Sequence, residues 1–149
     1  MLAAFKHWAV SAIALAAFVF APTALAQDTG FHVLDVASGY WGWELPEGED
    51  GGGTCADDPL HIWLSEDRTR FFSAHEGDDL TVEADILSTD SGWLAIRYDG
   101  EERLTDAGEP VVWILFLDSR DRFRWIRQDW IGTGRSTYPL VRCDDAQIG

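Results

Sequence analysis

Residues 80–86 of the chain read LTVEADI, and apolar and polar side chains alternate through this stretch without a break. In an extended strand Leu80, Val82, Ala84 and Ile86 lie on one face, and the Thr, Glu and Asp side chains between them lie on the other. This period of two is typical of an antiparallel strand with one buried and one solvated face. We find no helical period of convincing length, so the sequence predicts an all-β fold.

Further strand-like segments lie on both sides of this stretch, separated by turn residues. They are expected around residues 40–45, 60–65, 68–74, 93–98, 111–117, 122–127 and 138–142. The turn at 118–121 predicts a hairpin between the two segments that flank it. Asp99-Gly100 predicts a tight hairpin in which the strand at 93–98 returns along 101–104.

About eight short antiparallel strands in one domain predict an up-and-down β-barrel, because closure removes both unpaired sheet edges. A β-sandwich is the alternative, since strand counting alone does not separate the two. The two cysteines, Cys55 and Cys143, are expected to form a disulfide that joins an early segment to the last strand. They lack the spacing of a metal or redox site.

The N-terminus has the organisation of a secretory signal peptide. Lys6 provides a positive start, residues 9–21 are apolar apart from one serine, and residues 24–26 read Ala-Leu-Ala, which suits a signal peptidase. An uncleaved membrane anchor is the alternative, because the apolar stretch is nearly long enough to span a bilayer. Pro22 argues against the anchor, since it breaks a helix just before the cleavage site.

We therefore divide the chain into a signal peptide that is removed and one exported domain. The predicted boundaries are 1–26 for the signal peptide, 27–38 for an N-terminal lead-in, 39–143 for a single β-barrel domain and 144–149 for a C-terminal tail. No second long apolar run follows, so we expect no membrane span after cleavage and a periplasmic or secreted protein.

The exported part is strongly acidic. The chain carries 26 acidic and 11 basic residues, a formal net charge of -15, and its only lysine, Lys6, lies in the signal peptide. Such a charge repels nucleic acid, and it favours either cationic partners or simply solubility. We expect a monomer that binds a small molecule or another exported protein, with no cofactor.

Gly39-Tyr40-Trp41 opens the first long strand, and this Gly-x-Trp resembles the start of lipocalins and other calycin-like barrels. In that family an arginine late in the barrel packs over the first-strand tryptophan at the closed end. The resemblance therefore implies structural roles for Trp41 and Arg142, with Arg124 or Arg127 as other candidate partners. It also implies ligand binding without naming a ligand.

Seven tryptophans follow the signal peptide, which is the most unusual feature of the composition. They are Trp41, Trp43, Trp63, Trp93, Trp113, Trp125 and Trp130. They could fill the core of a small barrel, or they could line a pocket for an apolar or sugar-like ligand. Trp43, Trp63 and Trp130 have polar neighbours or lie near loops, which favours them as contact residues.

Residues 120–130 alternate arginine and aromatic side chains, and they reverse the overall acidity locally. Arg122 and Arg124 share one face of the predicted strand, while Phe123, Trp125 and Arg127 share the other. These arginines could bind an anionic ligand or a partner's carboxylates, or they could only neutralise neighbouring acids. The candidate ligand-binding residues are thus Trp43, Trp63, Arg122, Arg124, Trp125, Arg127 and Trp130.

No pattern in the sequence supports catalysis. His32, His61 and His75 are scattered without metal-ligand spacing, and no nucleophile or zinc-protease motif is present. We expect a non-enzymatic binding protein for an apolar or amphipathic molecule, which could carry an anionic group. The alternative is a protein-interaction module or an inhibitor of an exported hydrolase, with a loop at 47–58 that enters the partner's cleft.

Overall fold

The computed structural model describes residues 30–49 and 51–144, so the predicted signal peptide and most of the C-terminal tail lie outside the described residues. The described part begins with a short helix, continues with eight strands and includes one 3₁₀ turn. The elements are α1 (Val33–Val36), β1 (Gly39–Trp43), β2 (Leu60–Leu64), β3 (Arg70–His75), β4 (Val82–Asp90), β5 (Trp93–Tyr98), β6 (Trp113–Ser119), β7 (Arg122–Arg127), η1 (Gln128–Trp130) and β8 (Pro139–Arg142).

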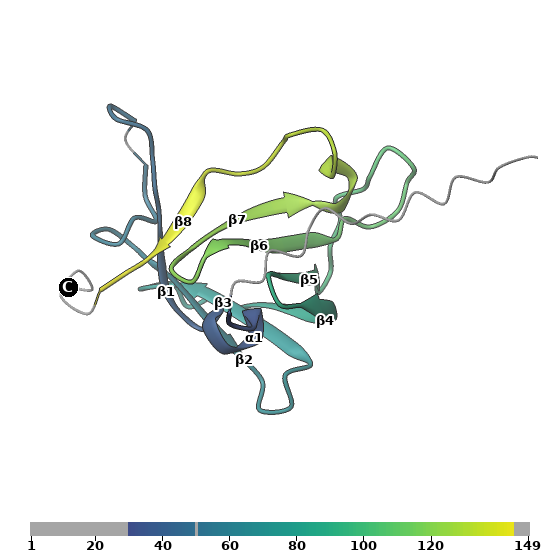
Figure 1. Ribbon diagram of the computed structural model, residues 1–149, viewed down its shortest axis with the longest axis horizontal. Helices are drawn as coiled ribbons and strands as arrows, with labels where there is room; N and C mark the ends of the chain where they lie inside the picture. Colours follow the sequence, from purple (N-terminus) through teal and green to yellow (C-terminus); the bar gives the residue numbers. More distant parts are fainter. Residues whose placement is uncertain (1–29, 50, 145–149) are drawn as a thin grey trace, which may run out of the picture.

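Each strand pairs antiparallel with the next, and β1 also pairs with β8, so the sheet closes into a barrel (Figure 1). The closing pair aligns Trp41 with Arg142 and Trp43 with Leu140. The predicted up-and-down barrel is confirmed, and the single closed sheet excludes the β-sandwich. This topology is compatible with a calycin-like fold.

Alternation along the strands separates an apolar interior from a charged exterior. In β4, Ala84 is buried, whereas Glu83 and Asp85 are exposed. β4 begins at Val82 and runs to Asp90, so it starts later and ends later than the alternating stretch at 80–86 predicts. A register shift after Ile86 ends the simple alternation there.

The half of the barrel next to α1 is filled by side chains. Its members with almost no solvent exposure include Trp41, Phe71, Phe123, Ile62, Leu94, Ile96, Leu115, Leu117 and Leu140. α1 contacts β4 and β5 and adds Val33 and Val36 to this core. We call this end, where β1 begins and β8 finishes, the closed end. Helix α1 was not predicted, because four residues are too few to show a helical period.

The predicted hairpin at Asp99-Gly100 is wrong. A turn is present, since the Glu101 amide donates to the Tyr98 carbonyl at 3.2 Å, but no strand follows at 101–104. β5 pairs with β6 instead, and residues 99–112 form a long loop between them. The physical reason is that β6 offers buried apolar side chains to the interior beside β5, whereas 101–103 read Glu-Glu-Arg.

The predicted disulfide between Cys55 and Cys143 is confirmed, with Cα atoms 5.2 Å apart. It fastens the loop between β1 and β2 to the residue that follows β8. The loop lies directly against β1, because a Cβ atom placed on Gly42 would meet the Cys55 amide nitrogen at 2.2 Å.

Candidate functional site

The end of the barrel opposite α1 holds a pocket, which we call the mouth pocket. Its volume is about 510 Å³, within the range of small-molecule sites. It lies where β1 and β5 finish and where β2 and β6 begin. The lining therefore comes from residues at the ends of several strands, and the long loop at 99–112 adds Asp99, Glu101 and Arg103.

The wall of the mouth pocket is mainly aromatic and aliphatic. Its large side chains are Trp43, Leu60, Leu80, Val82, Tyr98, Trp113 and Trp125. Leu80 and Val82 are 70% and 39% exposed, because they stand at the rim instead of in the filled half. Exposed apolar surface that borders a pocket is typical of a ligand entrance or an interaction site.

The floor of the mouth pocket is the top of the filled core. Trp125 meets Phe71 and Phe123 edge to face, with ring centroids 5.8 and 5.6 Å apart. Phe123 in turn meets Trp41 at 4.7 Å. The aromatic residues thus serve both predicted purposes, because they fill the closed half and line the open half.

One buried carboxylate stands in the wall of the pocket. The Glu101 side chain is only 3% exposed, and the Trp113 indole nitrogen donates to its Oε2 atom at 3.1 Å. The Arg103 guanidinium donates to both carboxylate oxygens, with Nε–Oε1 at 2.5 Å and Nη2–Oε2 at 2.7 Å. Burial raises the pKa of Glu101, but the hydrogen bonds from Arg103 and Trp113 outweigh it and hold that pKa below its usual value.

Arg103 also covers two aromatic rings of the wall. Its guanidinium carbon lies 4.9 Å from the Trp113 ring centroid and 5.8 Å from that of Tyr98. Burial raises the pKa of the Tyr98 hydroxyl to about 12, so this group is neutral at physiological pH. On the opposite side of the mouth, His75 Nδ1 lies 2.9 Å from the Asp58 carbonyl oxygen.

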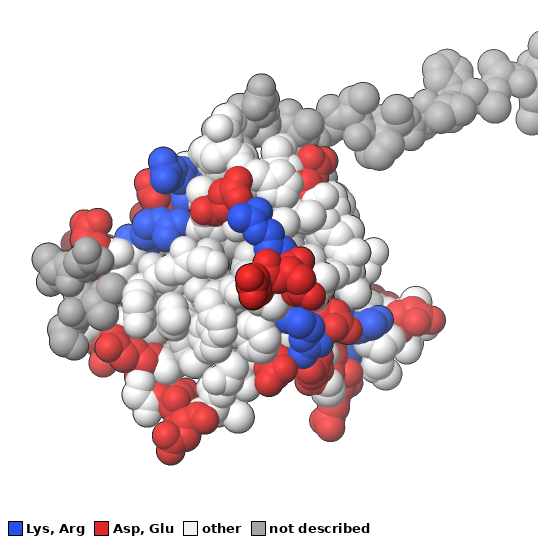
Figure 2. Space-filling model, turned by 90° about the horizontal axis from the view of Figure 1, so that it is seen from below, with Lys and Arg blue, Asp and Glu red and all other residues white. Residues whose placement is uncertain are grey.

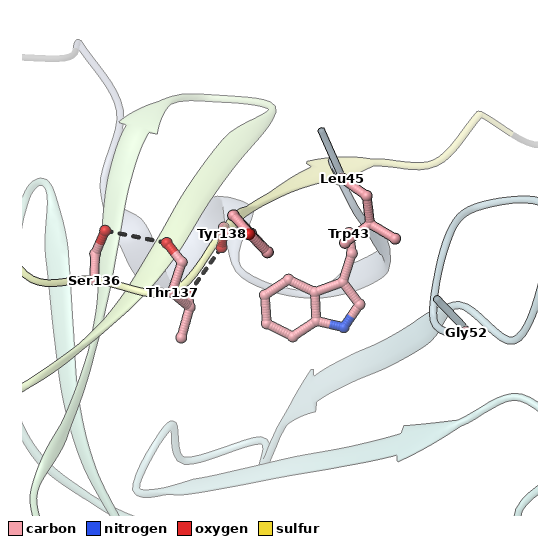
Figure 3. A pocket seen from close by; sticks show the side chains of 6 residues that line it. All are labelled: Trp43, Leu45, Gly52, Ser136, Thr137 and Tyr138. Carbon is pink, nitrogen blue, oxygen red and sulfur yellow. Dashed lines mark hydrogen bonds between the residues drawn. The ribbon is translucent and has the colours of Figure 1, made fainter. Parts of the chain in front are cut away.

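A second pocket of about 600 Å³ adjoins the first (Figure 3). It shares Trp43 and Thr137 with the mouth pocket and is otherwise lined by Leu45, Gly52, Ser136 and Tyr138. Figure 3 shows the Trp43 indole between the 136–138 segment and Gly52. None of its six lining residues is ionisable in the physiological range. The mouth pocket combines an apolar wall with charged side chains, so it is the better candidate site.

The structure brings two of the seven candidate ligand-binding residues, Trp43 and Trp125, into the mouth pocket. Trp63 lies elsewhere and stacks between His61 and Phe72, with ring centroids 4.9 and 5.6 Å away. Trp130 stands outside the pocket, at 5.9 Å edge to face from Trp113.

The three candidate arginines are held by carboxylates. Arg122 and Arg124 both donate to Asp118, and Arg122 also donates to Glu44. Arg127 pairs with Asp129 at 2.8 Å. Over the face seen in Figure 2, arginine side chains lie next to acidic ones in the same way. An anionic ligand at this strip would have to compete with these carboxylates.

Arg142 lies over Trp41 at the closed end, with the guanidinium carbon 4.3 Å from the ring centroid. Of the three arginines considered as partners for Trp41, it is the one that the structure places there. Sequence reasoning did not select the other lining residues, among them Tyr98, Glu101 and Arg103, and it gave Trp113 only as one of the seven tryptophans that could line a pocket. Glu101 and Arg103, the first and last residues of the loop's Glu-Glu-Arg run, gave no signal, because the predicted hairpin placed them in a strand.

Comparisons with known proteins add no relative: no protein-family model, no curated protein sequence and no solved structure matches the chain. Within the described residues, no group of three or more histidine, cysteine or acidic side chains is arranged to hold a metal ion. The same part of the chain has no helix with the length and apolar character that crossing a membrane requires.

Proposed function

We propose that the exported domain is a non-enzymatic binding protein that takes an apolar or amphipathic small molecule into the mouth pocket. The observation that carries the proposal is the aromatic pocket of about 510 Å³ above a floor of close-packed side chains. Trp43, Trp113 and Trp125 supply large rigid faces, and Leu80 and Val82 provide an apolar entrance. The disulfide supports export to the periplasm or the medium, where such bonds persist.

The test is a titration of the folded, signal-free domain with N-phenyl-1-naphthylamine, a neutral apolar dye. We expect saturable binding of one dye per chain. Val82→Arg places a long charged side chain at the entrance and should weaken binding at least tenfold. Leu87→Arg is the matched control, because Leu87 is also on β4, is 42% exposed and does not line the pocket.

The control should bind as the unchanged protein does, and circular dichroism should show both variants folded. Absence of saturable binding by the unchanged protein would contradict the proposal. Equal weakening by the two variants would contradict it as well, because the dye would then bind outside the mouth.

A second candidate function is a protein-interaction module, including an inhibitor of an exported hydrolase. The observation that favours it is a set of exposed apolar side chains on the loops around the mouth. These are Leu80, Leu104, Ile131 and Tyr138, which are 48% to 70% exposed. Native mass spectrometry of protein purified from its own compartment separates the two candidates: a retained small molecule supports the first, and a bound protein supports the second.

A further inference from the structure

We propose that the mouth pocket recognises the cationic head of an amphipathic molecule, a guanidinium or quaternary ammonium group, and that the Arg103 side chain occupies this subsite in the free protein. The inference rests on the proposed function and names the class of ligand. Its basis is the arrangement of Glu101, Tyr98 and Trp113 around the Arg103 guanidinium.

These three residues form the parts of a cation cage. A cation over the face of a tryptophan or tyrosine ring is attracted by the ring's negative face, and quaternary ammonium ligands are recognised in this way. Here the guanidinium of Arg103 covers both rings and forms a two-point contact with the Glu101 carboxylate. The site therefore already holds a cation, supplied by the protein itself.

The anionic part of the cage is fixed, and the cationic part is exposed. Glu101 is 3% exposed, whereas the Arg103 side chain is 55% exposed. If Arg103 swings out, Glu101 keeps two donors, the Trp113 indole and the backbone amide of Arg103 at 3.0 Å. The carboxylate thus keeps two donors and its place in the wall, and a carboxylate that has lost its cation favours binding of a new one.

The other charges around the mouth also favour a cation. The pocket is lined by Asp78, Asp99 and Glu101, and Arg103 is the one arginine among the lining residues. Asp99 is engaged by Arg70 at 2.6 Å, so it is partly neutralised. The whole chain has a formal net charge of -15, which adds a field of the same sign.

The apolar part of the pocket continues from the cage and can hold a hydrocarbon tail. Trp43, Trp125 and Leu60 lie in the same pocket as Tyr98 and Trp113. A ligand with a cationic head and an apolar body would therefore satisfy both parts of the wall. The Arg103 side chain must leave the cage before the ligand enters. The protein therefore binds such a ligand more weakly than a variant whose cage is already empty.

The test compares decyltrimethylammonium with decyl sulfate below their micelle concentrations, by calorimetry on the folded domain, with N-phenyl-1-naphthylamine as the neutral reference. We expect the cationic probe to bind at least tenfold more tightly than the anionic one. Arg103→Ala empties the cage and should tighten cationic binding by about tenfold, in line with a cation–aromatic and ion-pair contact. Glu101→Gln should reduce the ratio of cationic to neutral affinity by at least tenfold.

Arg97→Ala is the matched control, because Arg97 is an exposed arginine on β5 outside the pocket. It removes the same charge without emptying the cage, so it should change cationic affinity less than twofold. If Arg97→Ala and Arg103→Ala increase the affinity for the cationic probe equally, the preference reflects only net charge and the inference is overturned. Tighter binding of decyl sulfate, or weaker cationic binding by Arg103→Ala, would also overturn it.

The outcomes separate this inference from the proposed function. If the neutral dye binds and the cationic probe has no advantage, only the cation subsite is excluded. If no probe binds, the proposed function fails together with the inference. If Glu101→Gln fails to fold, Arg103→Ala and its control Arg97→Ala still test the cation subsite. The Arg103 side chain is largely exposed, so its removal should leave the domain folded.

Discussion

Arg142 joins three separate segments at the closed end of the barrel. Its guanidinium lies over Trp41, donates to the carbonyl oxygens of Val36 and Ser38, and pairs with Asp121. The close approach also explains Gly39, where a Cβ atom would lie 2.5 Å from the Arg142 Nη1 atom and where φ is +136°. One planar guanidinium with several N–H donors therefore joins β8 to the end of α1 and to the turn before β7.

We expect Arg142→Lys to lower the free energy of unfolding by about 1 to 3 kcal/mol, because lysine cannot reach both carbonyls and the ring together. Arg124→Lys is the control, since Arg124 pairs with Asp118 on the outer wall. An ion pair between partly exposed side chains at the surface contributes about 1 kcal/mol. Urea unfolding of both variants measures the difference, and equal losses would refute the special role of Arg142.

Gly42 is required by the close approach of the disulfide-bearing loop to β1. In Gly42→Ala the new methyl group would meet backbone atoms of Cys55 and Thr54 at 2.2 and 2.7 Å, and backbone cannot move aside as a flexible side chain can. We expect a loss of about 1 to 3 kcal/mol, the usual cost of overpacking. Thermal unfolding and thiol labelling should show a lower melting temperature and slower formation of the Cys55–Cys143 bond.

Gly92→Ala tests whether this loss is specific. A Cβ atom at Gly92 has no neighbour within 4 Å, so the substitution should change stability by less than about 0.5 kcal/mol. A similar loss at both glycines would mean that backbone flexibility, and not the contact with Cys55, governs the effect.

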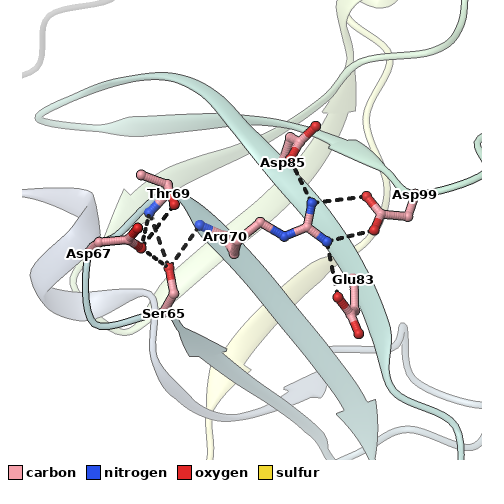
Figure 4. Close-up of polar contacts among 7 residues, drawn as sticks. All are labelled: Ser65, Asp67, Thr69, Arg70, Glu83, Asp85 and Asp99. Atoms are coloured by element: carbon pink, nitrogen blue, oxygen red, sulfur yellow. Dashed lines mark hydrogen bonds and ion pairs between the residues drawn. The ribbon is translucent and has the colours of Figure 1, made fainter.

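At the scale of elements, Arg70 connects three neighbouring strands on the outer wall (Figure 4). From β3 it pairs with Glu83 and Asp85 of β4 and with Asp99, which follows β5. Without Arg70, three carboxylates would face one another across adjacent strands, where like charges are destabilising. The hydrogen bond from Arg70 is the main reason that the pKa of Asp99 lies below its usual value.

Arg70→Met should therefore lower the melting temperature near pH 7 by several degrees, and the deficit should shrink in acid. A lowered pKa in the folded state means that the stabilisation is complete above the unfolded carboxyl pKa of about 4 and is lost as the pH falls through the lowered value. Below that value the carboxylates are protonated in both proteins. Melting curves from pH 7 to pH 2.5 check this, with Arg120→Met as the exposed control.

A deficit that stays constant across the pH range would contradict the prediction. It would show that the aliphatic part of Arg70, which methionine only partly replaces, matters more than its charge. Asp67 and Glu101 also have lowered pKa values and retain their partners in the variant, so both proteins should lose stability in strong acid.

At the scale of the molecule, the barrel consists of a filled half that stabilises the fold and an open half that can bind. Leu117, at 1% exposure, belongs to the first half, and Leu80, at 70%, belongs to the second. The filled half supplies the stability of the barrel. The open half can therefore carry exposed apolar side chains at the mouth.

We predict that Leu117→Ala lowers the free energy of unfolding by about 2 to 5 kcal/mol, as for other buried leucines. At a temperature where this variant is folded, its affinity for the neutral dye should be unchanged. Leu80→Ala should change stability by less than about 0.5 kcal/mol and weaken dye binding about threefold or more through lost apolar contact. Comparable destabilisation by both changes would contradict the division into two halves.

By itself, the sequence determined the features that depend on local pattern and on cysteine count. Alternation along 80–86 and 122–127 places Ala84, Phe123 and Trp125 inside, and the two cysteines had only each other as partners. Up-and-down closure followed because short antiparallel strands leave edges that a barrel removes. These conclusions need only the period of two and the presence of two cysteines in the sequence.

Only the tertiary structure decided which residues line the mouth and which partner each arginine finds. The Asp99-Gly100 turn is a local signal, but strand pairing depends on burial against distant neighbours, so β6 replaced the expected strand at 101–104. The same loop then carried Glu101 and Arg103 to Trp113, twelve and ten residues further along the chain. Contacts of this kind depend on barrel closure and loop path, which no local period of side chains encodes.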